Sequence, residues 1–97
     1  MRRSVVYGGR ARDDLAQIEE LIRNLSGSAD LAQSYVEDIM RMCRGLADFP
    51  FRGLAVDLSR PGSRLLGFRR RGAIFFRVEE ERVVILRVYY GRQSLFD

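Results

Sequence analysis

Residues 61–91 read PGSRLLGFRRRGAIFFRVEEERVVILRVYYG, and this stretch carries most of the information about the architecture. Three runs rich in Val, Ile, Leu, Phe and Tyr alternate with two charged segments, one of three arginines and one of three glutamates. β-Branched and aromatic residues favour strands, and short polar segments between such runs favour hairpin turns. The stretch therefore predicts three consecutive antiparallel strands, over residues 64–68, 73–78 and 83–90.

Two helices are predicted ahead of this meander. Apolar residues between positions 11 and 25 recur every three or four residues, which is the spacing of one face of an α-helix. The segment 26–28 breaks this pattern, and a second helix of the same kind runs towards Pro50. We place Asp13 and Asp14 in the first turn of the first helix, where the helix dipole favours acidic residues. The two apolar faces are Ala11, Leu15, Ile18, Ile22 and Leu25, then Leu31, Tyr35, Ile39, Met42 and Leu46.

Shorter strands flank the helices. Residues 4–7 read SVVY and are bounded by two glycines, and residues 54–58 form a short edge segment before the meander. The helices can bury their apolar faces only against the sheet. The order of elements therefore predicts a two-layer α+β fold, with an N-terminal strand and an α-helical hairpin packed on an antiparallel β-meander. A chain of 97 residues is enough for one domain and too short for two, so we expect a single domain over residues 1–97.

The composition narrows the possible chemistry. The chain has no histidine, and all seventeen of its basic residues are arginine. This excludes Ser–His and Cys–His catalytic pairs, histidine metal ligands and lysine Schiff bases. We interpret Cys43, the only cysteine, as a small core residue on the apolar side of the second helix. We interpret the glutamates at 79–81 as a solvated turn, and we expect neither a metal nor a cofactor.

The positive charge is concentrated in the second half of the chain. Residues 1–48 hold seven arginines and eight acidic residues, whereas residues 49–97 hold ten arginines and five acidic residues. An acidic or nucleic-acid partner is therefore sought first on the second half, although this charge alone does not establish direct nucleic-acid binding. The apolar runs are far shorter than the roughly 20 residues of a membrane span, and the N-terminus lacks a secretory apolar region. We therefore expect a cytoplasmic protein that does not enter the membrane.

Five short motifs run in order along nearly the whole chain. They are A..DL..I at 11–18, A..Y...I at 32–39, LADFPFRG at 46–53, PGSRLLGF at 61–68 and ILRVYYGRQ at 85–93. Each motif is a common pattern, but their order and spacing in a chain of this length make the match specific. The sequence resembles the ParE-type toxins of the RelE/ParE toxin–antitoxin superfamily.

The resemblance implies a function and two partners. Proteins similar to this one are toxins of type II toxin–antitoxin systems, in which a ParD-like antitoxin neutralises the toxin and DNA gyrase is the target. Other superfamily members are ribosome-dependent mRNA endoribonucleases, and this is the alternative function, together with an inactive member that retains antitoxin binding. Because a domain this small leaves apolar surface exposed, we expect an amphipathic antitoxin helix to lie in a groove, with its acidic residues against the arginines.

The residues favour a toxin that acts by binding over a nuclease. By the resemblance, two arginines of ribonuclease relatives fall near Ala73 and Gln93, and a lysine pair falls near Arg64 and Leu66. Arginine is a poor proton shuttle because its pKa lies above about 12. Several parts of the ribonuclease set are therefore missing, and we lean towards a protein that is not an enzyme. The residues left for a nuclease are Arg64, Arg87 and Tyr90, the last of which stands where many ParE-type relatives carry histidine.

Eight residues are candidate contacts for a target or partner. Three of them form a cationic hairpin tip, and Arg64 opens a strand, with an ion pair to Asp57 as the rival role. Arg87 interrupts an apolar strand, so its guanidinium must reach solvent or a carboxylate, and we favour a structural role. Tyr89 and Tyr90 point to opposite faces, so one packs and the other remains available. The full set is Arg64, Arg69, Arg70, Arg71, Arg87, Tyr89, Tyr90 and Arg92.

Overall fold

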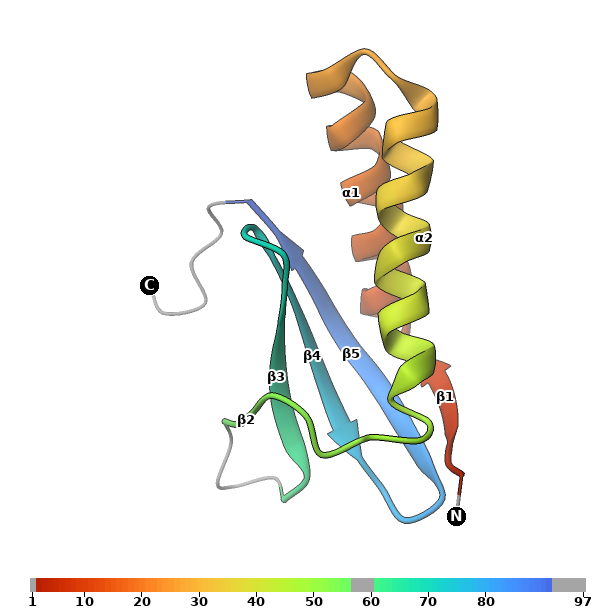
Figure 1. The fold of residues 1–97 in the computed structure, drawn as a ribbon, viewed down its shortest axis with the longest axis vertical. Helices are drawn as coiled ribbons and strands as arrows, with labels where there is room; N and C mark the ends of the chain where they lie inside the picture. Colours follow the sequence, from red (N-terminus) through yellow and green to blue (C-terminus); the bar gives the residue numbers. More distant parts are fainter. Residues whose placement is uncertain (1, 57–60, 92–97) are drawn as a thin grey trace.

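The computed structural model describes residues 2–56 and 61–91, and two helices pack on a five-stranded sheet (Figure 1). The elements are β1 (Ser4–Tyr7), α1 (Gly9–Ser26), α2 (Ala29–Gly45), β2 (Leu54–Ala55), β3 (Ser63–Phe68), β4 (Gly72–Val78) and β5 (Arg82–Tyr90). The strands lie in the order β1-β5-β4-β3-β2, with β1 parallel to β5 and every other pair antiparallel. The predicted two-layer α+β fold is confirmed. The end of the predicted edge segment and the C-terminal tail, 57–60 and 92–97, lie outside the described residues.

Short local interactions build the turn between the two helices. Gly27 adopts a left-handed backbone conformation with φ 71°, and its N–H donates to the Arg23 carbonyl at 2.8 Å, which ends α1. Ser28 caps α2, because its Oγ accepts the N–H of Leu31 at 3.0 Å. At its other end, α2 stops at Gly45 rather than near Pro50, because the chain tightens there into hydrogen bonds between residues three apart. The helices therefore form the predicted antiparallel hairpin.

The core lies between the hairpin and the inward side of the sheet. Four residues of β4 and β5 are completely buried: Ile74, Phe76, Val83 and Ile85. Cys43 is also buried, which confirms its interpretation as a core residue. Fifteen buried residues make up this cluster: Ala11, Leu15, Ile18, Ile22, Ala32, Val36, Ile39, Cys43, Leu46, Phe68, Ile74, Phe76, Val83, Ile85 and Val88.

Two predictions about the helices are wrong. The periodicity places Leu25 and Leu31 on buried faces, but they are 72% and 55% exposed. Both leucines lie next to the turn between α1 and α2, in the part of the hairpin that extends beyond the end of the sheet (Figure 1). The first turn of α1 also contains no acidic residue, because the helix already begins at Gly9. Asp13 and Asp14 therefore lie one turn further along, and Asp14 binds the sheet instead.

A break in register decides which side chains of β5 face the helices. Phe76 pairs with Ile85 and Phe75 pairs with Arg87, so Leu86 is an extra residue in β5. Before this bulge Val83 and Ile85 face the core, and after it Val88 and Tyr90 do. Without the bulge, the strict alternation of a strand would turn Arg87 towards the helices. The bulge keeps this cation out of the core.

Candidate partner-binding site

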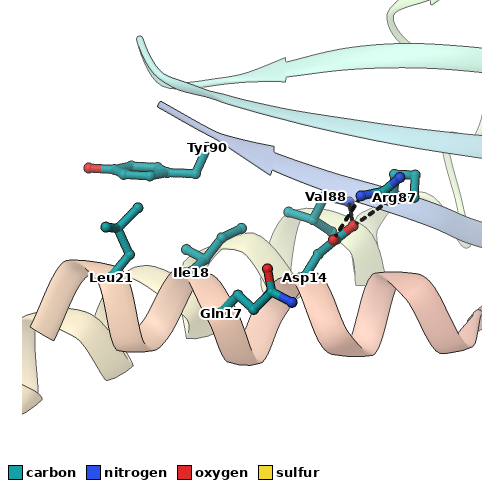
Figure 2. Close-up of a pocket in the computed structure, with 7 residues that line it drawn as sticks. All are labelled: Asp14, Gln17, Ile18, Leu21, Arg87, Val88 and Tyr90. Carbon is teal, nitrogen blue, oxygen red and sulfur yellow. Dashed lines mark hydrogen bonds and ion pairs between the residues drawn. The ribbon is translucent and has the colours of Figure 1, made fainter. Parts of the chain in front are cut away.

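An open groove lies between α1 and the second half of β5. Its cavity has a volume of about 270 Å³ and is drawn in Figure 2. The charged residues stand at one end of the groove, whereas Leu21 and Tyr90 stand at the other, with Ile18 between them (Figure 2). The residues lining it are Asp14, Gln17, Ile18, Leu21, Arg87, Val88 and Tyr90. The groove therefore offers an apolar surface next to a fixed ion pair.

Asp14 fixes the charged end of the groove. Its Oδ2 accepts the Nε–H of Arg87 at 2.8 Å, and its Oδ1 accepts an Nη2–H of the same guanidinium at 3.1 Å. Oδ2 also accepts the backbone N–H of Val88 at 2.9 Å. Partial burial would by itself raise the pKa of Asp14, but the hydrogen bonds from Arg87 and Val88 outweigh it and hold this pKa below its usual value. Of the two alternatives for Arg87, solvent or a carboxylate, the structure shows the carboxylate.

The position of Asp14 follows from the length of β1. That strand pairs only with residues 82–85, and the N–H of Gly8 makes the next bond, to the Ile85 carbonyl at 2.9 Å. From there the chain turns into α1, so no strand of the described residues lies beside the following edge of β5. Asp14, on the second turn of α1, supplies the acceptor for Val88 that a longer β1 would have supplied. The same side chain therefore closes the sheet edge and pairs with Arg87.

The apolar end of the groove continues onto the tip of the hairpin. Leu21 is 43% exposed, and Leu25, one helical turn further along α1, lies on the same side of the helix. Leu31 at the start of α2 is exposed as well. The Tyr90 ring is held by an edge-to-face contact with Tyr35, with ring centroids 5.2 Å apart. We call Leu21, Leu25 and Leu31 the hairpin-end leucines.

Three further candidates, Arg69, Arg70 and Arg71, lie on the turn between β3 and β4. Arg69, which has a left-handed backbone with φ 54°, turns back onto α2 and binds Asp38, and its guanidinium carbon lies 5.0 Å from the Phe68 ring centroid. Arg70 and Arg71 are exposed at the turn between β3 and β4. Because Gly72 pairs with Tyr90 and the Gly91 N–H donates to the Arg71 carbonyl at 2.9 Å, this turn lies beside the apolar end of the groove.

Two other candidates, Arg64 and Tyr89, lie outside the groove. Arg64 donates to the carbonyls of Arg52 and Gly53 at 2.8 and 3.0 Å, and its predicted rival partner Asp57 lies outside the described residues, as does Arg92. Tyr89 projects from the face of β5 opposite to Tyr90, and the Arg87 guanidinium carbon lies 5.3 Å from its ring centroid. The seven candidates within the described residues therefore do not form one site.

Five residues that line the groove were not among the site candidates from the sequence: Asp14, Gln17, Ile18, Leu21 and Val88. Asp14 and Leu21 flank the buried Ile18 at spacings of four and three, so they lie along one side of the helix in a stripe that overlaps the buried one. This stripe was the available signal for Asp14 and Leu21. Gln17 carries no comparable signal, because a polar residue at that position is ordinary on a helix surface.

The described residues offer little for nucleophilic or metal chemistry. Burial raises the pKa of the Cys43 thiol to about 11, so it is not a thiolate at neutral pH. Within residues 2–56 and 61–91, no group of three or more His, Cys, Asp or Glu side chains is placed to hold a metal ion. Glu79, at the turn after β4, is instead paired with Arg77 and Arg82. In the same part of the chain, neither helix is long and apolar enough to cross a membrane.

Several solved structures that share this arrangement of helices and strands are described as toxin–antitoxin proteins. The chain is 27% identical to a protein of the chromosomal ParDE toxin–antitoxin system from P. aeruginosa, with a TM-score of 0.77 over 92% of this chain and 96% of that one. It is 21% identical to a chain of the RelBE2 toxin–antitoxin complex from Mycobacterium tuberculosis, with a TM-score of 0.68 and coverage of 94% and 93%. The E. coli DinJ–YafQ toxin–antitoxin complex shares the fold at 13% identity, with a TM-score of 0.63 and full coverage of both chains.

The family match and the likeness to the ParDE protein define the class as the toxins of type II toxin–antitoxin systems. Residues 5–95 match the family described as the ParE toxin of type II toxin–antitoxin system, parDE. The chain belongs to this ParE toxin family. A search of curated proteins gives no match.

Proposed function

We propose that this toxin acts by binding DNA gyrase and that a ParD-like antitoxin neutralises it. The family match over residues 5–95 supports a ParE-type activity. The alternative, an endoribonuclease, needs groups that activate a 2′-hydroxyl and protonate a leaving oxygen at a single point. Each of the residues left for that role is held by a different partner: Arg64 binds loop carbonyls, Arg87 binds Asp14, and Tyr90 contacts Tyr35 edge to face.

The dispersal of these three side chains is the observation that carries the proposal. A phosphoryl-transfer site requires its groups to converge on one phosphate. Arg64 and Tyr90 stand on different strands and at different ends of them, because Tyr90 lies opposite Gly72 whereas Arg64 lies opposite Phe76. A protein that binds its target without chemistry needs no such convergence.

The activity is tested by incubating the purified toxin with DNA gyrase and supercoiled plasmid. We expect gyrase-dependent cleaved DNA to accumulate with toxin concentration, and added antitoxin to suppress it. Toeprinting on translating ribosomes is the matched control, since only a ribonuclease leaves cuts at A-site codons. Unaffected gyrase together with ribosomal cuts would contradict the proposal, and growth that is unharmed by expression without antitoxin would point to an inactive toxin.

The antitoxin is proposed to occupy the groove between α1 and β5. An amphipathic helix could place apolar residues on Tyr90 and the hairpin-end leucines, in the manner of other helices bound in grooves. Its acidic residues would then lie near Arg70 and Arg71, which border the same end of the groove. The toxin–antitoxin complexes among the similar structures support a partner of this kind.

A further inference from the structure

A second exposed surface lies at the end of the molecule opposite the hairpin turn. The connection between α2 and β2 carries Phe49 and Phe51, which are 72% and 64% exposed. Arginines from β3, from the last turn of α2 and from the residues before β1 gather around this connection. We call this the arginine–phenylalanine surface; it comprises Arg2, Arg3, Arg44, Arg64, Phe49 and Phe51.

Two arginines are fixed beside Phe51. The guanidinium carbons of Arg3 and Arg64 lie 5.3 and 5.9 Å from the centroid of its ring. Arg3 is held by one hydrogen bond from Nε to the Glu79 carbonyl at 2.8 Å, and Arg64 by two bonds to loop carbonyls. A guanidinium has five N–H donors, so each of these side chains keeps donors for another acceptor.

Three arginines also share one small cavity. Arg2, Arg3 and Arg44 line it together with Ser4, Val5 and Ala47, and its volume is about 230 Å³. The carbonyls at the end of α2 are already used, because they accept the N–H groups of Arg3 and of residues 46–49. The arginines are therefore not needed to cap the helix.

Among the described residues, one acidic side chain near this cavity forms an ion pair with its arginines. Asp48 lies 3.7 Å from Arg2 in a pair that is exposed on both sides. The turn after β4 contributes Glu80 and Glu81, which are exposed, and Glu79, whose carboxylate is engaged by two other arginines. Exposed pairs of this kind hold their partners weakly, so an external anion can replace the carboxylate.

We propose that the arginine–phenylalanine surface binds single-stranded nucleic acid. Phosphates would occupy the cavity between Arg2, Arg3 and Arg44, whose planar guanidinium groups match phosphate oxygens. Bases would stack on the exposed ring of Phe49, in the way that aromatic platforms bind single strands. An acidic peptide would also satisfy the arginines, but the exposed aromatic faces of Phe49 and Phe51 next to them favour a ligand that carries both phosphates and flat bases. The proposal holds whether gyrase or the ribosome is the target.

Binding is measured by fluorescence anisotropy with a labelled oligothymidylate of about twelve nucleotides. We expect saturable binding at low salt that weakens by about 20-fold between roughly 50 and 200 mM salt, the result for about three phosphate contacts on a single strand. The double variant Arg2→Ser/Arg44→Ser should abolish most of it. Its matched control is Arg70→Ser/Arg71→Ser, which removes the same charge at the turn that lies at the other end of the sheet in Figure 1.

A third variant separates stacking from simple apolar contact. Phe49→Leu keeps an apolar side chain of similar length but removes the aromatic face, so oligonucleotide affinity should fall at least about fivefold. Thermal unfolding of each variant shows whether it is folded. Three results would overturn the proposal: no binding at low salt, equal weakening by both arginine pairs, or an unchanged affinity in Phe49→Leu. Preferential binding of an acidic peptide, unaffected by Phe49→Leu, would identify a protein-binding surface instead.

Discussion

Two arginine–aspartate pairs join the helices to the sheet, and they differ in what surrounds them. Asp14 and Arg87 join α1 to β5, and the Asp14 side chain is 11% exposed and also accepts a backbone N–H. Asp38 and Arg69 join α2 to the turn after β3, and Asp38 is more exposed and shares its carboxylate with Arg41. The first pair completes a hydrogen-bond pattern that the sheet leaves open, whereas the second adds an ion pair at the surface. We therefore expect the two pairs to contribute different amounts to the free energy of unfolding.

The largest expected effect is the loss of unfolding free energy when the Asp14 carboxylate is removed. Asp14→Ala leaves the Val88 N–H and the Arg87 guanidinium without their acceptor, so it should lower the free energy of unfolding by about 2–3 kcal/mol. Asp38→Ala should cost clearly less, because solvent screens an exposed pair. Urea denaturation of both variants measures the difference, with Asp13→Ala, an exposed neighbour, as control. Equal losses for Asp14 and Asp38 would show that the backbone bond contributes nothing.

Acid should weaken the Asp14 contact. The folded-state pKa of this carboxyl is depressed, so its stabilisation is fully present above the unfolded pKa near 4 and is lost as the pH falls through the folded value. The stability difference between the parent and Asp14→Asn, which cannot ionise, should therefore be constant near neutral pH and shrink below about pH 4. Urea denaturation at a series of pH values measures it. A difference that does not change with pH would mean that the charge of Asp14 is not what stabilises the contact.

The general layout could be predicted from the sequence because it follows from hydrophobic spacing. The alternation of strands and turns and the helical faces report local structure, which one sequence records directly. The exposure of Leu25 and Leu31 could not be predicted from the sequence, because it depends on how far the hairpin extends past the sheet. The bulge at Leu86 could not be predicted either, because it changes the side of the sheet to which the following side chains point without leaving a signal in the composition.

The candidate site was less predictable than the fold. Arg87 could be recognised as needing a partner, but Asp14 is 73 positions away in the chain, and only the packing of α1 on β5 brings them together. The sequence likewise places Arg69 in a cationic hairpin tip. The structure shows that its left-handed backbone directs the side chain to Asp38. In both cases the sequence identifies the charge and tertiary packing determines its use.

We expect the antitoxin to bind the groove beside the Asp14–Arg87 pair. A variant of Leu25 tests this expectation. Leu25→Asp should weaken antitoxin affinity by about tenfold or more, because a charge would be buried under an apolar helix face. The free energy of unfolding of the Leu25→Asp variant should equal that of the parent toxin, because Leu25 is largely exposed in the free toxin. Leu54→Asp is the matched control, because Leu54 is similarly exposed but lies on β2. Isothermal titration with the antitoxin would contradict the assignment if both variants lost affinity equally.

The smallest expected effect is on the rate of antitoxin association. It separates Arg70 and Arg71 from Arg69 on the turn after β3. Arg70→Ser/Arg71→Ser should slow association with an acidic antitoxin severalfold at low salt and flatten its salt dependence, because exposed charges steer encounter. Adding Arg69→Ser should slow it little more, since Asp38 already offsets that charge. Stopped-flow association rates at two salt concentrations measure both steps. A triple variant much slower than the double one would mean that Arg69 leaves Asp38 for the partner, so that the second pair is a switchable contact and the first alone is fixed.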